Sequence, residues 1–149
     1  MRKRSVPYDI IAIGDATVDV FLRLNDASVH CNLDRRNCVL CLRYADKIPV
    51  ESVTQTPAAG NAANNAVGSA RLGLSAALTV ILGDDEPGRV IQKELQKNGV
   101  SLEYVMLDRK RGTNYSTVLN FQRERTILVY HEQRTYRLPK LASAFWVYL

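Results

Sequence analysis

The stretch A-A-G-N-A-A-N-N-A-V-G-S-A-R-L-G, residues 58–73, contains almost no bulky side chains, and three amides interrupt it. A helix is predicted from Gly60, because an apolar stripe recurs at helical spacing. Its members are Ala63, Val67 and Ala70. Gly73 stands where the C-terminal end of a helix needs a residue that adopts positive φ. We therefore expect a short helix whose entrance is lined by very small residues.

The N-terminal end of this helix is suited to binding a ligand. A helix start rich in Gly and Ala leaves its first N–H groups open to a ligand and lets the ligand approach the backbone. The amides of Asn61 and Asn64 each offer a donor and an acceptor, as a sugar hydroxyl requires. Composition alone leaves two interpretations: a site for a polyhydroxylated ligand, or an Ala-rich helix packed on a sheet with its Asn residues exposed.

The flanking segments predict an α/β fold. Short continuous apolar runs at 8–14 and 75–82 are typical of strands buried on both faces. A second helix is expected after 84–86, because acidic residues and then Pro87 form a favourable first turn, and Asn98-Gly99 ends it. Strand, helix, strand and helix in this order indicate a mostly parallel sheet.

The remaining segments look like further strands and loops. Alternating or apolar runs predict strands at 17–24, 38–44, within 114–130, and at 145–149. Residues 25–37 are expected to be a polar loop, and 45–57 to be extended or looped, with Pro49 and Pro57 against a helix. Because the sequence stops inside an apolar run, we expect it to be a truncated part of a larger domain.

Composition excludes several classes of protein. The 149 residues are 46% hydrophobic and 23% charged, as in a soluble globular domain. No apolar run is long enough for a membrane helix, and Asp9, Asp15 and Asp19 interrupt the one stretch that resembles a signal peptide. The net charge of +5 comes from scattered residues rather than a basic stripe, so we expect no nucleic-acid partner. We expect a cytoplasmic protein.

Three cysteines leave a metal site open as an alternative. An odd number without a secretory signal makes a disulfide framework unexpected. His30, Cys31, Cys38 and Cys41 are possible zinc ligands. Cysteines that act as small buried hydrophobes are the commoner case, so we predict no metal site.

Several motifs, in this order, resemble the ribokinase-like family of carbohydrate kinases, also called the phosphofructokinase-B family. IIAIGDATVDVFLRL (10–24) is similar to that family's first strand with its G-D-x-x-x-D element. AAGNAANNAVGSARLG is similar to its Gly-Gly-x-x-x-Asn helix start followed by A-R-L-G, and GDDEPG to its G-x-D-x-x-G. The resemblance runs from about Asp9 to Leu149.

The resemblance implies an architecture. Residues 1–149 would be the N-terminal part of a single ribokinase-like α/β domain, a three-layer fold with a central mostly parallel sheet. A small β-sheet lid would come from strands within 17–57 and 114–130. Lids in this family often pair between subunits, which implies a possible homodimer of the complete protein.

The resemblance also implies a reaction: transfer of a phosphoryl group from ATP, with Mg²⁺, to a hydroxyl on a sugar or sugar-like molecule. The substrate-binding residues implied are Asp19, Gly60, Asn61 and Asn64. Asp15 is the less favoured carboxylate, and Ala59 departs from the family's first Gly. His131 has no nucleophile partner in the sequence and is interpreted as structural.

The family's catalytic base lies in a G-A-G-D element near the nucleotide site, and this sequence contains no such element. We therefore expect the chain to hold the substrate side, without catalytic base or nucleotide site, and to be inactive alone. Two alternatives stay open: a fragment of a nucleoside kinase of the adenosine type, or a non-catalytic module that binds a sugar or nucleoside.

Overall fold

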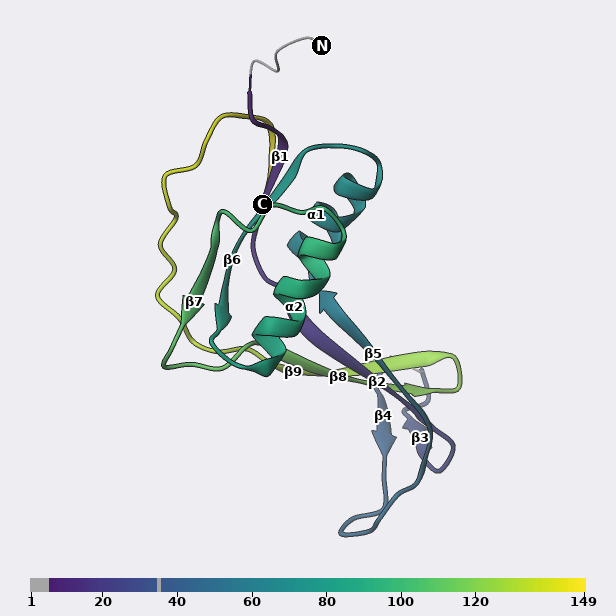
Figure 1. Cartoon of the computed structure of the whole chain (residues 1–149). Coiled ribbons are helices and arrows are strands. Elements are labelled where there is room, and N and C mark those ends of the chain that lie inside the picture. The colour runs from purple at the N-terminus through teal and green to yellow at the C-terminus, as the bar shows by residue number, and fades with distance from the viewer. Residues whose placement is uncertain (1–5, 35) are drawn as a thin grey trace.

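Four parallel strands form the central sheet of the computed structural model, which describes residues 6–34 and 36–149 (Figure 1). Their order across the sheet is β10–β1–β6–β7. The strands span Tyr8–Ile13 (β1), Ala76–Gly83 (β6), Val105–Asp108 (β7) and Ala144–Tyr148 (β10). The predicted parallel sheet is confirmed, with β7 as a strand that the sequence reading did not identify.

Two helices, α1 (Asn61–Arg71) and α2 (Glu86–Lys97), cover one face of this sheet. Small residues let α1 lie close to the strands, because its buried side chains are all alanines. They are Ala62, Ala63 and Ala66. The buried face is therefore rotated from the predicted stripe, and Val67 and Ala70 lie at its margin. Ile91 and Leu95 of α2 complete the core against Leu78, Val80 and Leu82.

The other face of the sheet is covered by an extended segment, residues 131–143, rather than by a helix. Leu141 of this segment packs against a small second core of Ile11, Ala77 and Tyr104. The Tyr104 hydroxyl accepts a hydrogen bond from the Ala142 backbone N–H at 3.0 Å. The segment thus carries the chain from the second sheet back to β10.

The second sheet has the order β5–β2–β8–β9. It contains β2 (Thr17–Leu24), β5 (Val50–Ala59), β8 (Tyr115–Phe121) and β9 (Glu124–Tyr130). The inner pair β2–β8 is parallel and both outer pairs are antiparallel. Gln122 and Arg123 join β8 to β9 with φ angles of 50° and 69°, as a tight two-residue hairpin turn requires. Residues 50–59 form a strand paired with β2, where the sequence suggested an extended or looped segment.

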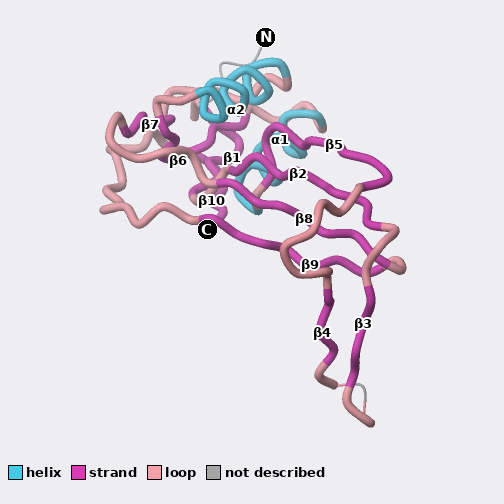
Figure 2. The backbone as a smooth tube through the Cα atoms, turned by 90° about the horizontal axis from the view of Figure 1, so that it is seen from below, coloured by secondary structure: helices cyan, strands magenta, loops and turns pink. Residues whose placement is uncertain are grey.

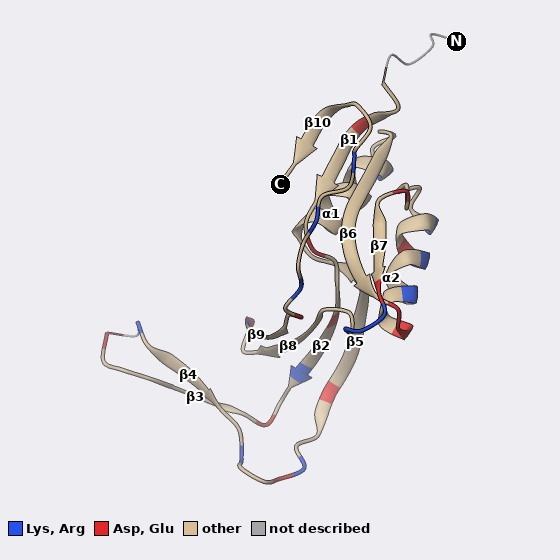
Figure 3. Cartoon of the chain, turned by 90° about the vertical axis from the view of Figure 1, so that its left-hand side faces the viewer, with Lys and Arg blue, Asp and Glu red and all other residues tan. Residues whose placement is uncertain are grey.

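A separate hairpin, β3 (Ser28–Cys31) and β4 (Cys38–Cys41), projects from the rest of the molecule (Figures 2 and 3). The prediction of a loop over the first of these strands was wrong. Cys31 and Cys38 are register partners with Cα atoms 4.1 Å apart, and they form a disulfide. The expectation of no disulfide was therefore wrong: the turn between them brings the two thiols face to face.

Cys41 is a free thiol. Within residues 6–34 and 36–149, no group of three or more His, Cys, Asp or Glu side chains is arranged to hold a metal ion. No helix in the same residues is long and apolar enough to cross a membrane.

Candidate functional site

A cavity of about 380 Å³ lies where β1 and β10 end and α1 begins. It therefore lies at the carboxyl edge of the parallel strands, the usual place for ligands in open α/β sheets. Its walls come from four segments that are far apart in the sequence. They are formed by Ile13, Gly14, Asp15, Thr17, Gly60, Asn61, Ala62, His131, Tyr148 and Leu149.

Gly60 is the N-cap residue of α1, and its backbone conformation sets how the chain enters the helix. Its φ is 100°, and a Cβ added there would lie 2.7 Å from the backbone oxygen of Asp15. Only glycine meets both conditions without strain. No side chain caps the N-terminal end of α1, so no side chain occupies its first N–H groups. Gly60 and Asn61 both line the cavity, in agreement with the expected position of an open helix entrance.

Asp19 lies two residues further along β2 than Thr17 of the cavity wall. Its register partners are Thr56 on β5 and Ser116 on β8. Oδ1 of Asp19 is buried and has no hydrogen-bond partner. A register irregularity lies between Thr17 and Asp19, a feature that changes the direction of side chains near functional sites. Asp19 is thus beside the cavity without lining it.

The amides of α1 are divided between two environments. Asn64 is exposed and does not line the cavity, although its N–H donates to Gly60 O at 2.8 Å. Asn65 instead has a buried Oδ1 without a partner. Sequence reasoning missed Asn65, although its separation of four residues from Asn61 puts both on one helix face. The structure therefore brings Gly60 and Asn61 together and leaves Asn64 further out.

The side chains of Asp15 and His131 lie next to each other at the cavity wall. Nδ1 of His131 is 3.4 Å from Oδ2 of Asp15. His131 directly follows β9, and Asp15 lies in the connection between β1 and β2. The two residues are distant in the sequence, so only the fold reveals the pair. The sequence indicated a structural role for His131 and did not predict that this residue lines the cavity.

Asp85 connects the start of α2 to the segment that leads into β8. Its carboxylate accepts hydrogen bonds from Gly88 N at 2.9 Å, Thr113 N at 2.7 Å and Thr113 Oγ1 at 2.6 Å. Burial alone would raise the pKa of Asp85, but these hydrogen bonds and the nearby charge of Arg134 together hold it below its ordinary value. Asp85 is the N-cap of α2 and ties that helix to the start of β8.

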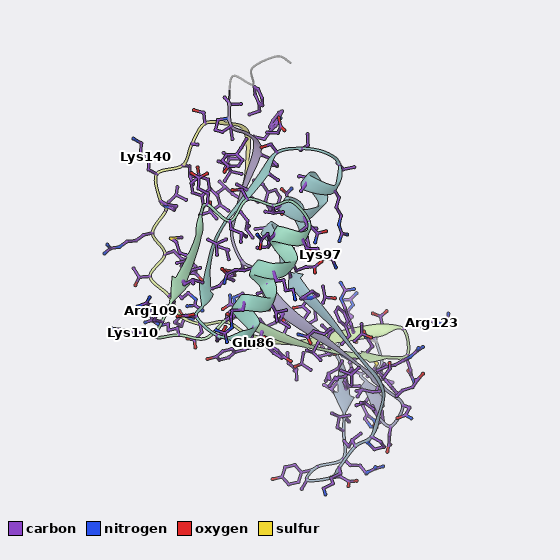
Figure 4. All side chains as sticks on the ribbon, in the orientation of Figure 1. Glu86, Lys97, Arg109, Lys110, Arg123 and Lys140 are labelled. Carbon is purple, nitrogen blue, oxygen red and sulfur yellow. A yellow bond between two sulfur atoms is a disulfide. The ribbon has the colours of Figure 1, made fainter. Side chains whose placement is uncertain are left out.

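Arg134 holds the extended segment to this same region. Its side chain is only 1% exposed, and Nη1 donates to Asp108 Oδ2 at 2.9 Å. Nη2 donates to the Gly112 carbonyl oxygen. Other basic residues are spread over different elements, with Lys97 on α2 and Arg123 at the β8–β9 turn (Figure 4). The positive charge is therefore distributed rather than gathered beside the cavity.

Comparison with known proteins identifies a family and relatives that this chain resembles. Residues 25–149 match the model of the pfkB family carbohydrate kinase. The 5-dehydro-2-deoxygluconokinase of Bacillus subtilis is 30% identical over 128 residues, which cover 84% of this chain and 33% of that protein. The corresponding protein of Bacillus velezensis is 31% identical over 128 residues, again 84% and 33% of the two chains. The chain spans about a third of the length of these curated relatives.

Solved structures agree on the fold. Arabidopsis thaliana ribokinase, complexed with ribose and ATP, matches with a TM-score of 0.64 and 21% identity over 83% of this chain and 36% of that one. A ribokinase described from Agrobacterium tumefaciens gives 0.65 and 23% over 87% and 40%. The predicted ribokinase-like α/β fold is confirmed. The chain belongs to the pfkB family of carbohydrate kinases.

Proposed function

We propose that this chain forms the acceptor side of an ATP-dependent carbohydrate kinase and binds the hydroxyl groups of a sugar. The observation that carries the proposal is Asp19 Oδ1, which is buried without a partner. Leaving a buried acceptor unpaired costs about 1–3 kcal/mol or more for a charged group. A sugar hydroxyl that donates to this oxygen would remove that cost on binding.

The remaining groups complement the carboxylate. Asp19 supplies acceptors, whereas the uncapped entrance of α1 at Gly60 supplies donors. The amide of Asn61, which lines the cavity, supplies both, and we propose that the exposed amide of Asn64 adds to it from outside the cavity lining. Because a sugar hydroxyl both donates and accepts, this combination suits it better than a cluster of charges of one sign. Asn65 joins the set, because its buried oxygen also has no partner.

The second sheet would act as the lid of the site. The sheet carries Asp19, and its strand β2 begins at the cavity wall. A closed lid keeps water from competing with the sugar hydroxyl for the phosphoryl group. Its outer strand β9 exposes Ile127, Leu128 and Val129. We propose that this apolar edge pairs with a second copy in the complete enzyme.

We propose that the described residues do not by themselves bind ATP and Mg²⁺. The 149 residues contain no G-A-G-D element, and the described part of the chain contains no acidic or mixed cluster that could hold a metal ion. ATP and Mg²⁺ would be bound by parts of a complete kinase outside these residues. Because loss of a general base alone costs about 10²- to 10⁴-fold in rate, we propose that the chain has no useful kinase activity by itself.

The relatives' names suggest substrates to test. The two bacterial relatives are named as kinases of a dehydro-deoxy-gluconate, and the plant structure contains ribose. We propose a sugar or sugar-like acceptor for this chain, used in the cytoplasm.

Thermal shift with a panel of sugars and nucleosides tests the binding proposal. A sugar present at a free concentration of about one hundred times its Kd should raise the free energy of unfolding of the chain by about 2.7 kcal/mol. Asp19→Asn keeps the shape of the side chain but removes its charge, and it should abolish this gain. Glu86→Gln, which removes an exposed carboxylate on α2, is the control and should leave the gain intact. Stabilisation by nucleosides alone would favour the nucleoside-kinase alternative.

A coupled assay of ATP consumption tests the second part. We expect no turnover above background from the chain with ATP, Mg²⁺ and the stabilising sugar. Turnover typical of a kinase, on the order of 1 per second or faster, would contradict the proposed absence of a base and nucleotide site.

A further inference from the structure

The cavity at the start of α1 is poor in positive charge. Asp15 is the one acidic side chain among its lining residues and His131 the one basic side chain, and neither Lys nor Arg lines it. The two side chains are 3.4 Å apart and both are partly exposed. Whether the imidazole is protonated or neutral, the pair carries either no net charge or one negative charge.

A carboxylate entering this cavity would therefore meet Asp15 with no Lys or Arg beside it, and with the imidazole of His131 as the one basic side chain that faces it. The entrance of α1 offers partial compensation, because a helix N-terminus is equivalent to roughly half a positive charge. That is less than the full negative charge of Asp15. Repulsion between two like charges at contact distance near a protein surface weakens binding, and it raises the dissociation constant on the order of tenfold or more.

A neutral polyol meets none of this repulsion. Its hydroxyls can donate to Asp15 or accept from His131, and they can also bond the amide of Asn61. We propose that Asp15 and His131 determine specificity, and that they select a neutral hydroxylated end of the substrate over a carboxylate. This inference rests on the proposed function, since it concerns the same site. It separates this chain from relatives named for a gluconate-type substrate.

Two probes of matched size test the inference by isothermal titration calorimetry. D-glucitol and D-gluconate have the same six-carbon chain and differ at C1, where a CH₂OH replaces a carboxylate. We expect the wild-type chain to bind D-glucitol about tenfold more tightly than D-gluconate. Asp15→Asn should reduce the ratio to about twofold by improving D-gluconate binding, because it removes the repelling charge without changing the shape.

Two further variants make the result decisive. Glu86→Gln removes a carboxylate that does not line the cavity and should leave the ratio unchanged. His131→Gln leaves Asp15 without its basic partner and should widen the ratio, which keeps a test available if Asp15→Asn does not fold. Wild-type chain that binds D-gluconate as tightly as D-glucitol, or a ratio that neither cavity variant moves, would overturn the inference. Binding of neither probe, although a sugar of the thermal-shift panel binds, would overturn the inference and leave the proposed function standing.

Discussion

At the scale of single residues, Gly60 joins the fold to the site. Its positive φ and the 2.7 Å approach of an added Cβ to Asp15 O are two separate reasons for glycine. Gly73 has only the first reason, because its φ is 88° but no atom lies within 4 Å of an added Cβ. Gly68 has neither reason, since it lies within α1 and faces open space.

This gradation predicts an order of stability for three alanine variants. Gly68→Ala should stabilise the chain by about 0.5–1 kcal/mol through helix propensity. Gly73→Ala should cost about 1 kcal/mol through its φ, and Gly60→Ala about 2–3 kcal/mol because the clash is added. Urea unfolding gives the three values. Equal costs at Gly60 and Gly73 would show that the close approach to Asp15 does not constrain the chain.

Asp85 predicts a dependence of stability on pH. Its pKa is lowered in the folded chain, so its contribution is fully present above the unfolded value of about 4 and is lost as pH falls through the lower folded value. Asp85→Asn should cost about 1–3 kcal/mol at neutral pH, because the Thr113 N–H loses its acceptor.

Urea unfolding of wild type and Asp85→Asn between pH 3 and pH 7 measures this effect. The difference in free energy of unfolding should be constant above about pH 5 and should shrink below about pH 4. A difference that grows on acidification would contradict the assigned direction of the pKa shift.

The sequence allowed part of the site to be predicted at this scale. Gly60 and Asn61 were found because a small-residue helix entrance is a local pattern. Asp15 and His131 were not paired, because their contact depends on how β9 returns to the end of β1. Asn65 was missed because its buried oxygen depends on the rotation of α1 about its axis.

At the scale of elements, the β3–β4 hairpin depends on its disulfide. All four residues of β3 are exposed, and a two-stranded hairpin is marginally stable in water without other support. The disulfide joins Cys31 to Cys38 across the turn. We therefore expect the hairpin to unfold locally when this disulfide is removed, while the central sheet remains folded.

Hydrogen exchange on a Cys31→Ser, Cys38→Ser double variant tests this expectation. Amides of residues 28–41 should exchange at least about tenfold faster, and the Tm should change by no more than about 2 °C. Cys41→Ser, which leaves the disulfide intact, is the matched control. Equal acceleration in β1 and β6 would mean that the hairpin and the core unfold as one unit.

Elements were predictable where local patterns are strong. Buried apolar runs identified β1 and β6, and Pro87 with Asn98-Gly99 bounded α2. The short strands β3 and β7 lack such patterns, since β3 is fully exposed and β7 has only four residues. Their strand conformation comes from partners: β4 for the first and β6 for the second.

At the scale of the whole molecule, two sheets meet at one site. The central sheet supplies the cavity floor at the ends of β1 and β10, and the second sheet supplies Thr17 of β2 to its wall. The proposed ligand Asp19 lies two residues further along the same strand. The order of motifs was enough to predict this fold and its family. It could not predict the extended segment 131–143, because that segment is held by individual contacts such as Arg134 with Asp108 rather than by a regular pattern.

The most direct test is a crystal structure of the chain with the sugar that stabilises it most in the thermal-shift panel. We predict a sugar hydroxyl within about 2.5–3.0 Å of Asp19 Oδ1, with the rest of the ligand against Gly60 and Asn61. A sugar bound elsewhere, with Asp19 Oδ1 still unpartnered or satisfied by the protein itself, would contradict the assignment of this region as the acceptor site.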